Sequence, residues 1–230
     1  ATTQVVGRDR YIEYVSWLAN VAASCEKILQ EIRNLQRSEI QEAGEGFDIK
    51  KQVGSSTMAH KKNPIKSENA SGLARIVRSM IIPTYENALL WHERDLANSS
   101  SERFTLSHAS ALCEDVISKT RQVLTNMWVD SERCLDNIKS QRGLVMAEKV
   151  MIELVEYGIP RDEAHEILRS ASFEAVDKKI ELIDVCSRTP EIAAAFSAEE
   201  LEAMFDPMNH IGVSGEIVDE AVDLARSAIL

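Results

Sequence analysis

The feature that most constrains the fold is a long amphipathic pattern near the start of the chain. Apolar side chains between Val5 and Gln41 keep to one helical face, and they are Tyr11, Tyr14, Val15, Leu18, Val21, Ala22, Cys25, Ile28, Leu29, Ile32 and Leu35. A helix over this whole range would be about 50 Å long at 1.5 Å per residue. Because a compact domain rarely covers a helix of that length, we expect an elongated bundle or an interface between subunits.

The segments that follow predict further helices with polar connections. The stretch 42–48 contains Gly44 and Gly46, which end the first helix and predict a mobile connection. Pro64 suits the first turn of a second helix, because a proline lacks the N–H that would be unpaired there. We expect this second helix to run from about residue 65 to residue 90 and to bend near Pro83, where a backbone hydrogen bond is lost.

Two helix starts are predicted in the next part of the chain. Ser99 and Glu102 match a capping box, which predicts a helix from there to about Met127. Asp130 or Ser131 then opens a short helix that ends at about residue 138. No strand-like alternation persists in the sequence, so the predicted fold class is all-α.

The sequence also predicts two domains. Beyond Gly143 the helices become shorter and are separated by residues 158–160, 188–190 and 206–207, each of which contains a proline. We therefore expect a helical bundle domain over residues 1–141, with a polar loop at 44–64, and a small helical domain over residues 142–230.

Composition excludes several classes of protein. The net charge of −11, from 37 acidic and 26 basic side chains, argues against a nucleic-acid partner, because phosphate binding relies on a basic surface. Four widely spaced cysteines favour reduced thiols of a cytoplasmic protein over disulfides or a zinc site. No apolar run approaches the roughly 20 residues of a membrane span, and no signal peptide is visible.

Chemistry-bearing residues gather in the polar loop. Ser55, Ser56 and Thr57 follow a glycine and precede a helix start, so their hydroxyls and nearby backbone N–H groups can converge on an anion. Lys61 and Asn63 add a positive charge and an amide. This set suits carboxylate or phosphate binding, or activation of one hydroxyl. A solvated linker whose serines cap the next helix is an equally good interpretation of the composition alone.

A second cluster surrounds the helix start near residue 99. Arg94 and Arg103 flank serines that include Ser99, and two arginines placed in this way could hold a phosphate. A capping box with surface ion pairs explains the same residues. The five histidines are scattered, and none has a partner at metal-ligand spacing.

The stretch Gly54-Ser-Ser-Thr-Met-Ala-His-Lys-Lys-Asn-Pro64 resembles the signature of the fumarase/aspartase superfamily, Gly-Ser-Ser-x-Met-Pro-x-Lys-x-Asn-Pro. The stretch Trp91-His-Glu-Arg-Asp-Leu-Ala-Asn-Ser-Ser-Ser-Glu-Arg103 and the early Thr3-Gln-Val-Val-Gly-Arg-Asp-Arg10 resemble its adenylosuccinate lyase branch. The resemblance covers most of the chain. It implies a long-helix bundle segment followed by a small helical domain, and β-elimination of fumarate from succinylated purine nucleotides.

The resemblance also implies roles for individual residues. It assigns the general base to Ser55, whose alkoxide the loop must stabilise, and it matches Lys61 and Asn63 to residues that meet the developing charge on the substrate carboxylate. Glu68 matches a supporting carboxylate. The remaining matches are substrate-binding residues, namely Gln4, Ser56, Thr57, Arg94, Ser99 and Arg103. No metal and no cofactor is implied.

The sequence departs from the family pattern in two ways. Ala59 stands where the family has proline, which we expect to make the closed loop costlier by about 0.4–1 kcal/mol. Family members are also roughly twice as long, and their general-acid histidine lies before the part that matches. We therefore expect the chain to be a carboxy-terminal fragment that is inactive alone, from a homotetramer whose subunits share active sites.

Two alternatives remain open at this stage. One is an enzyme similar to the carboxymuconate cycloisomerases of the same superfamily, which share the loop and a related last domain. The other is a helical scaffold derived from a lyase that has lost its activity.

Overall fold

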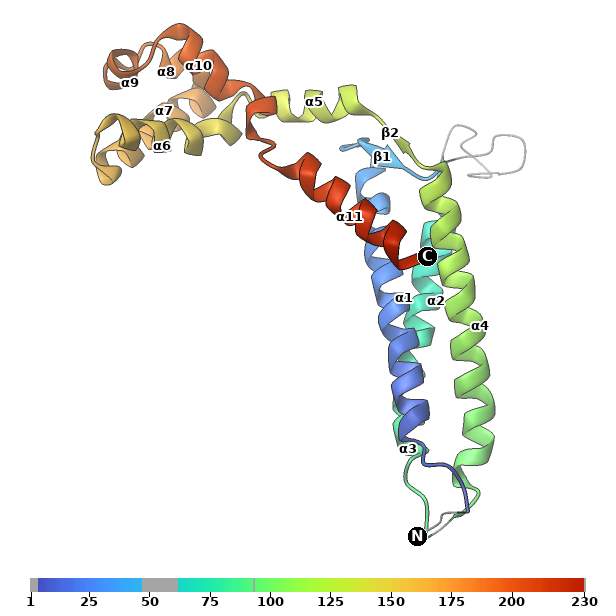
Figure 1. Cartoon of the computed structure of the whole chain (residues 1–230). Coiled ribbons are helices and arrows are strands. Elements are labelled where there is room, and N and C mark those ends of the chain that lie inside the picture. Colours follow the sequence, from blue (N-terminus) through green and yellow to red (C-terminus); the bar gives the residue numbers. More distant parts are fainter. Residues whose placement is uncertain (1–3, 47–61, 93, 230) are drawn as a thin grey trace. The chain divides into compact units, whose positions relative to one another are not determined.

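The chain folds into two compact units, residues 1–134 and 135–230, in a computed structural model that describes residues 4–46, 62–92 and 94–229. Helices dominate both units, as the all-α prediction requires (Figure 1). Ser55, Ser56, Thr57 and Lys61 lie outside the described residues, as does Ala59. The division between the units falls inside a helix, a little before the predicted domain boundary.

Three long helices build the first unit. Helix α1 spans Asp9–Leu35, α2 spans Ile65–Ser79 and α4 spans Ala97–Asn126, and each packs against the other two. Along the bundle, α1 and α4 start at one end and α2 starts at the other (Figure 1). Their contact surface is rich in small side chains, which let helices approach closely; the buried cluster consists of Val15, Leu18, Ala22, Ala74, Val77, Ala109, Cys113 and Val116.

The first helix is shorter than the sequence predicts. It contains 27 residues, so it is about 40 Å long rather than 50 Å. Residues 5–8 precede the helix, and it ends at Leu35 because the next residues fold into turns that close onto Arg37, whose carbonyl accepts the N–H groups of Ile40 and Gln41.

The second predicted helix is divided into two. Helix α2 ends at Ser79, and α3 spans Ile81–Glu86. The break at Met80 lies just before Pro83, whose ring leaves no N–H for the carbonyl of Ser79. The predicted bend is therefore a break three residues earlier, and helical structure stops four residues before the predicted end.

The predicted mobile connection at Gly44 and Gly46 is wrong for these two glycines. Gly44 belongs to strand β1, Ala43–Gly44, which pairs antiparallel with β2, Trp128–Val129. A Cβ on Gly44 would lie 2.6 Å from the Trp128 ring, and one on Gly46 would lie 2.2 Å from the carbonyl oxygen of Asn126. Close packing, rather than a hinge, explains glycine at both positions.

The capping box predicted at Ser99 and Glu102 is also wrong. Helix α4 begins two residues earlier, at Ala97, and Asp95 accepts hydrogen bonds from the backbone N–H of Ala97 and of Trp91, each at 2.8 Å. Glu102 is therefore free of a capping role and pairs elsewhere, as described below. The predicted end near Met127 agrees with the observed end at Asn126.

The second unit consists of short helices around its own core. After α5, Ser131–Ser140, come η1 (Leu144–Met146), α6 (Ala147–Tyr157), α7 (Arg161–Lys178), α8 (Leu182–Cys186), α9 (Pro190–Ala195), α10 (Ala198–Phe205), η2 (Pro207–His210) and α11 (Ser214–Ile229). Large buried side chains of the core include Leu154, Leu168, Leu182 and Ile192. The predicted separators lie at helix boundaries, with Pro190 and Pro207 as the first residues of α9 and η2. Asp130 accepts a hydrogen bond from the Arg133 N–H at the start of α5.

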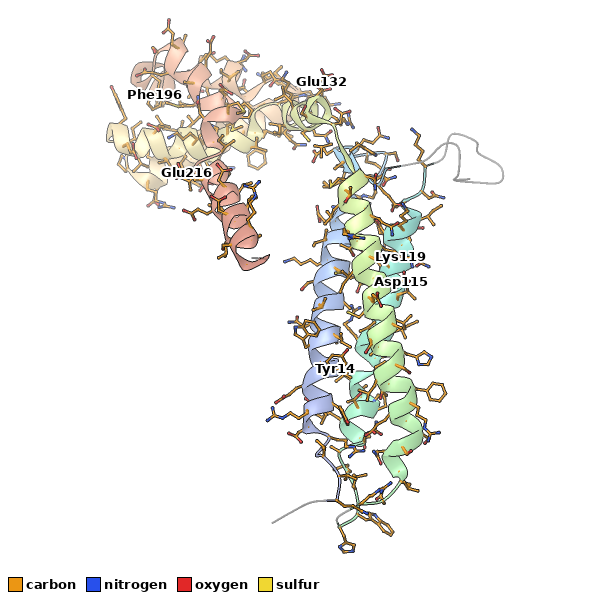
Figure 2. All side chains as sticks on the ribbon, turned by 45° about the vertical axis from the view of Figure 1, so that its right-hand side comes forward. Tyr14, Asp115, Lys119, Glu132, Phe196 and Glu216 are labelled. Atoms are coloured by element: carbon orange, nitrogen blue, oxygen red, sulfur yellow. The ribbon has the colours of Figure 1, made fainter. Side chains whose placement is uncertain are left out.

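Side chains of both units form ion pairs, and both units have exposed apolar side chains. Figure 2 shows all placed side chains on the ribbon. Asp115 and Lys119 form an i,i+4 pair on α4, whereas Tyr14 on α1 reaches Ser110 of α4, with 2.9 Å between the two hydroxyl oxygens. None of the described helices combines the length and the apolar character of a membrane span.

Candidate functional site

A small pocket lies where α1 and α4 begin. Its volume is about 100 Å³. It is lined by Val5, Arg8, Leu90, Arg94, Asp95, Leu96, Asn98, Ser99 and Glu102. Two sequence-predicted binding residues, Arg94 and Ser99, therefore share one pocket. Gln4 and Arg103 are exposed and lie next to pocket-lining residues in the sequence, but they are not part of the lining.

An ion pair between Arg8 and Glu102 forms the buried side of this pocket. Arg8 Nε donates to Glu102 Oε1 at 2.7 Å, and the two side chains are only 15% and 16% exposed. The Asn98 amide donates to the same oxygen at 2.8 Å. Burial tends to raise the pKa of Glu102, but the hydrogen bonds from Arg8 and Asn98 outweigh it, so the pKa lies below its ordinary value. Glu102 also raises the pKa of Arg8 through the same hydrogen bond.

Because Arg8 is paired with Glu102, other arginines must supply the positive charge for an anion at this end of the bundle. Arg8 is neutralised by Glu102, and Asp95 accepts backbone hydrogen bonds beside Arg94. Arg94 and Arg103 are both exposed, so either can meet an anion from solution. Sequence reasoning missed Arg8 and Glu102 as partners; the motif that contains Arg8 was the available signal.

A larger groove lies at the other end of the bundle, where α2 begins. It encloses about 650 Å³ and is open to solvent. Its lining consists of Gln30, Arg33, Asn34, Gln36, Arg37, Ser38, Gln41, Lys62, Asn63, Pro64 and Glu68. The predicted residues Asn63 and Glu68 are thus brought together. Three cationic side chains against one carboxylate make the groove suitable for a negatively charged ligand.

The start of α2 is not open to an anion. Glu45 is 4% exposed, and its carboxylate accepts from the backbone N–H of Lys66 at 3.1 Å and of Ser67 at 3.0 Å. The Ser67 hydroxyl donates to it at 2.9 Å. Sequence reasoning expected backbone N–H groups near this helix start to serve a ligand, but Glu45 already occupies two of them.

The two groups of predicted residues lie at opposite ends of the bundle. Arg94 and Ser99 are beside the start of α1, whereas Asn63 and Glu68 are beside its end, and α1 is about 40 Å long. Figure 1 shows the start of α2 and the start of α4 at the two ends of the first unit. Within the described part of one chain, these residues do not form one site.

A metal site and a nucleophilic cysteine receive no support among the described residues. No cluster of His, Cys, Asp and Glu side chains in residues 4–46, 62–92 and 94–229 has a metal-binding arrangement. Burial raises the pKa of the Cys113 thiol and raises that of Cys186 to about 12, so neither is poised to act as a nucleophile.

Comparisons with known proteins show what the chain is similar to. A family model described as "Adenylosuccinate lyase C-terminus" matches residues 143–221, and one described as "Lyase" matches residues 1–79. The chain is 42% identical to an adenylosuccinate lyase of Archaeoglobus fulgidus over 96% of its length. Over nearly its whole length the chain is therefore similar to adenylosuccinate lyases. An adenylosuccinate lyase of Methanothermobacter thermautotrophicus is 43% identical over 96% of the chain.

Coverage of these relatives is partial. The chain spans about half the length of the curated relatives it matches, 50% of the Archaeoglobus protein and 49% of the Methanothermobacter protein. A solved structure, the 3-carboxy-cis,cis-muconate lactonizing enzyme from Pseudomonas putida, has a TM-score of 0.83 at 29% identity, covering 94% of this chain and 47% of that one. The lactonizing enzyme therefore shares this all-α fold over the part that matches.

Proposed function

We propose that the protein containing this chain is a C–N lyase that releases fumarate from adenylosuccinate and from the succinylated carboxamide nucleotide of purine synthesis. The observation that carries the proposal is the sequence likeness to adenylosuccinate lyases over 96% of the chain. A groove rich in cations at one end of the bundle and exposed arginines at the other fit a substrate that carries carboxylates and a phosphate.

In the proposed reaction, a base removes a proton from the succinyl group and the carbon–nitrogen bond breaks. The electron pair of that bond goes to the nitrogen, which an acid protonates, and fumarate leaves. The family signature assigns the base to Ser55, with Ser56 and Thr57 beside it in the substrate-binding set. We assign the general acid to a histidine that is not among the five in this chain.

The negative charge of the intermediate develops on a substrate carboxylate. The signature assigns Lys61 and Asn63 to this carboxylate. A cation and an amide increase the rate most if their interaction with the carboxylate is strongest in the transition state. Asn63 borders the groove at the start of α2, and so does Glu68, the proposed supporting carboxylate.

The phosphate and remaining carboxylate are proposed to bind at the other end of the bundle. Arg94, Ser99 and Arg103 supply two charges and a hydroxyl there, with Gln4 near the reacting bond. Because α1 separates the two ends by about 40 Å, one substrate can meet both only if different copies of the chain contribute them. This separation supports an assembly, proposed as a homotetramer, with shared active sites.

Exposed apolar side chains on the bundle helices fit the same assembly. Trp17 is 58% exposed on α1, Ile76 is 43% exposed on α2 and Phe104 is 64% exposed on α4. Large apolar groups on several faces of one helical unit are typical of surfaces that subunits cover.

The test is an assay of the native gene product that contains residues 1–230. We expect stoichiometric AMP and fumarate from adenylosuccinate, and no turnover by residues 1–230 alone because the proposed general acid is missing. Lactonisation of 3-carboxymuconate without adenylosuccinate cleavage would favour the cycloisomerase alternative, for which the fold likeness to the Pseudomonas putida enzyme is the supporting observation. Activity toward neither substrate would favour a scaffold.

A further inference from the structure

Helix α2 receives its N-terminal cap from a residue distant in the sequence. Pro64, the residue before the helix, makes no side-chain capping bond. The carboxylate of Glu45 accepts three hydrogen bonds there instead, from the N–H groups of Lys66 and Ser67 and from the Ser67 hydroxyl. A carboxylate at a helix N-terminus is favoured by the helix dipole, and a buried one with three donors is well compensated.

A second side chain links the same two stretches of chain. Gln36, at the end of α1, accepts from the backbone N–H of Glu45 at 2.8 Å through Oε1. Its Nε2 donates to the carbonyl oxygen of Lys62 at 3.0 Å. One amide thus joins the end of α1, residue 45 and residue 62. Together the two side chains determine where the chain enters α2.

The position of Glu45 itself is set by the neighbouring strand pair. Glu45 directly follows β1, whose Gly44 pairs with Trp128, and the N–H of Asp130 donates to the carbonyl oxygen of Glu42 at 2.8 Å. Strand β2 and Asp130, which follow α4, therefore support the segment that carries Glu45, and Glu45 supports the start of α2.

The proposed site residues stand directly beside these anchored atoms. Asn63 follows Lys62, whose carbonyl is held by Gln36, and Glu68 follows Ser67, which is held by Glu45. Both Asn63 and Glu68 border the open groove, but Glu45 does not. The side chain of Glu45 therefore acts on a ligand in the groove indirectly, through the start of α2 that it caps.

We propose that Glu45, supported by Gln36, is a positioning residue: it holds the first turn of α2 so that Asn63 and Glu68 face the substrate. The inference rests on the proposed lyase function and adds residues to its site. A displacement of about 1 Å at a reacting centre can cost about 100-fold in rate, so loss of this cap lowers kcat without removing any group that touches substrate.

The test compares Glu45→Gln with Glu26→Gln in the native gene product. In Glu45→Gln an amide nitrogen replaces one acceptor oxygen, so at least one of the three hydrogen bonds is lost. Glu26 also links α1 to α2, through Arg75 and Arg78, but at residues remote from the groove. It is therefore a matched control for loss of a contact between these helices.

We expect Glu45→Gln to lower kcat for adenylosuccinate about 10- to 100-fold with KM within about threefold, and Glu26→Gln to leave kcat within about twofold. Combined with Asn63→Ala, Glu45→Gln should add little further loss, because both act on one group. Equal kcat for Glu45→Gln and wild type would overturn the proposal while leaving the lyase function intact. An inactive wild-type protein would overturn both.

Ser67→Ala provides a second variant if Glu45→Gln does not fold. It removes the hydroxyl that donates to Glu45 and keeps both backbone hydrogen bonds. We expect a soluble protein with a severalfold lower kcat and an unchanged KM. A kcat equal to that of the wild type would count against the proposal. Faster hydrogen exchange at the amides of Lys66 and Ser67 in this variant would show that the cap has loosened.

Discussion

At the end of the bundle where α4 begins, an ion pair between two side chains, Arg8 and Glu102, shapes the pocket. At the end where α2 begins, the carboxylate of Glu45 instead binds backbone N–H groups. The first arrangement neutralises an arginine and leaves other cations for a ligand. The second arrangement uses up the N–H groups of a helix start and fixes a segment of backbone. We propose that the α4 end is a charge-binding end, whereas the α2 end, whose groove also carries cations, in addition holds groups in position.

The largest expected effect comes from loss of the proposed general base. Ser55→Ala removes the proposed general base, so we expect kcat for adenylosuccinate to fall about 10²- to 10⁴-fold while nucleotide binding stays close to that of the wild type. Steady-state kinetics with a separate measurement of AMP binding checks both values. Turnover comparable with the wild type would remove Ser55 from the role of base.

A smaller effect is expected at the charge-binding end. Arg103→Ala should raise KM for the phosphorylated substrate about 10- to 100-fold, since a hydrogen bond to a charged group is worth about 1.5–3 kcal/mol, and should change kcat little. Arg10→Ala is the control, because Arg10 pairs with Glu13 on the exposed surface of α1. A fall in kcat with an unchanged KM would show that Arg103 does not bind ground-state substrate.

Alanine substitutions at Gly46 and Gly72 should change the free energy of unfolding in opposite directions. Gly46→Ala places a Cβ 2.2 Å from the Asn126 carbonyl oxygen, so we expect a loss of about 1–3 kcal/mol in the free energy of unfolding. Gly72→Ala, within α2, meets nothing within 4 Å and should gain up to about 1 kcal/mol. Denaturant unfolding of residues 1–230 measures both, and equal values for the two variants would contradict the tight approach at Gly46.

The smallest effect is an acid dependence at the charge-binding end. The pKa of Glu102 is lowered in the folded protein, so its contribution to stability is present above the ordinary glutamate pKa and is lost as pH falls through the lower folded value. Glu102→Gln should therefore flatten the fall in stability below about pH 4.5. Unfolding curves at several acidic pH values test this, and an unchanged slope would contradict the pKa direction.

Hydrophobic periodicity and the positions of glycine and proline were enough to predict the all-α class, the end of α4 and the boundaries between helices of the second unit. They overestimated α1, because residues 36–41 contain no glycine or proline that would mark the end of the helix, although the backbone turns there. They also misassigned Glu102, since its true partner, Arg8, is 94 residues away along the chain. Glycine at 44 and 46 looked flexible in sequence, although the reason for it is contact with residues 126 and 128.

The roles of the site residues stay predictions, and the structure shows only which of them lie together. The signature led to Asn63 and Glu68, and the arginine-flanked serines led to Arg94 and Ser99. Glu45 and Gln36 contact the start of α2 only in the folded chain. The spacing of residues in the sequence therefore gave no sign of the positioning role that we propose for them. The separation of the two groups by the length of α1 also becomes visible only once the helices are packed.

The central claim is that one substrate is bound by the α2 end of one copy and the α4 end of another. Mixing the Asn63→Ala and Arg103→Ala variants of the native gene product, after dissociation and reassociation, tests it most directly. Mixed assemblies contain some sites with both ends intact, so activity at low substrate concentration should rise above the sum of the two separate variants. A mixture no more active than that sum would contradict the claim.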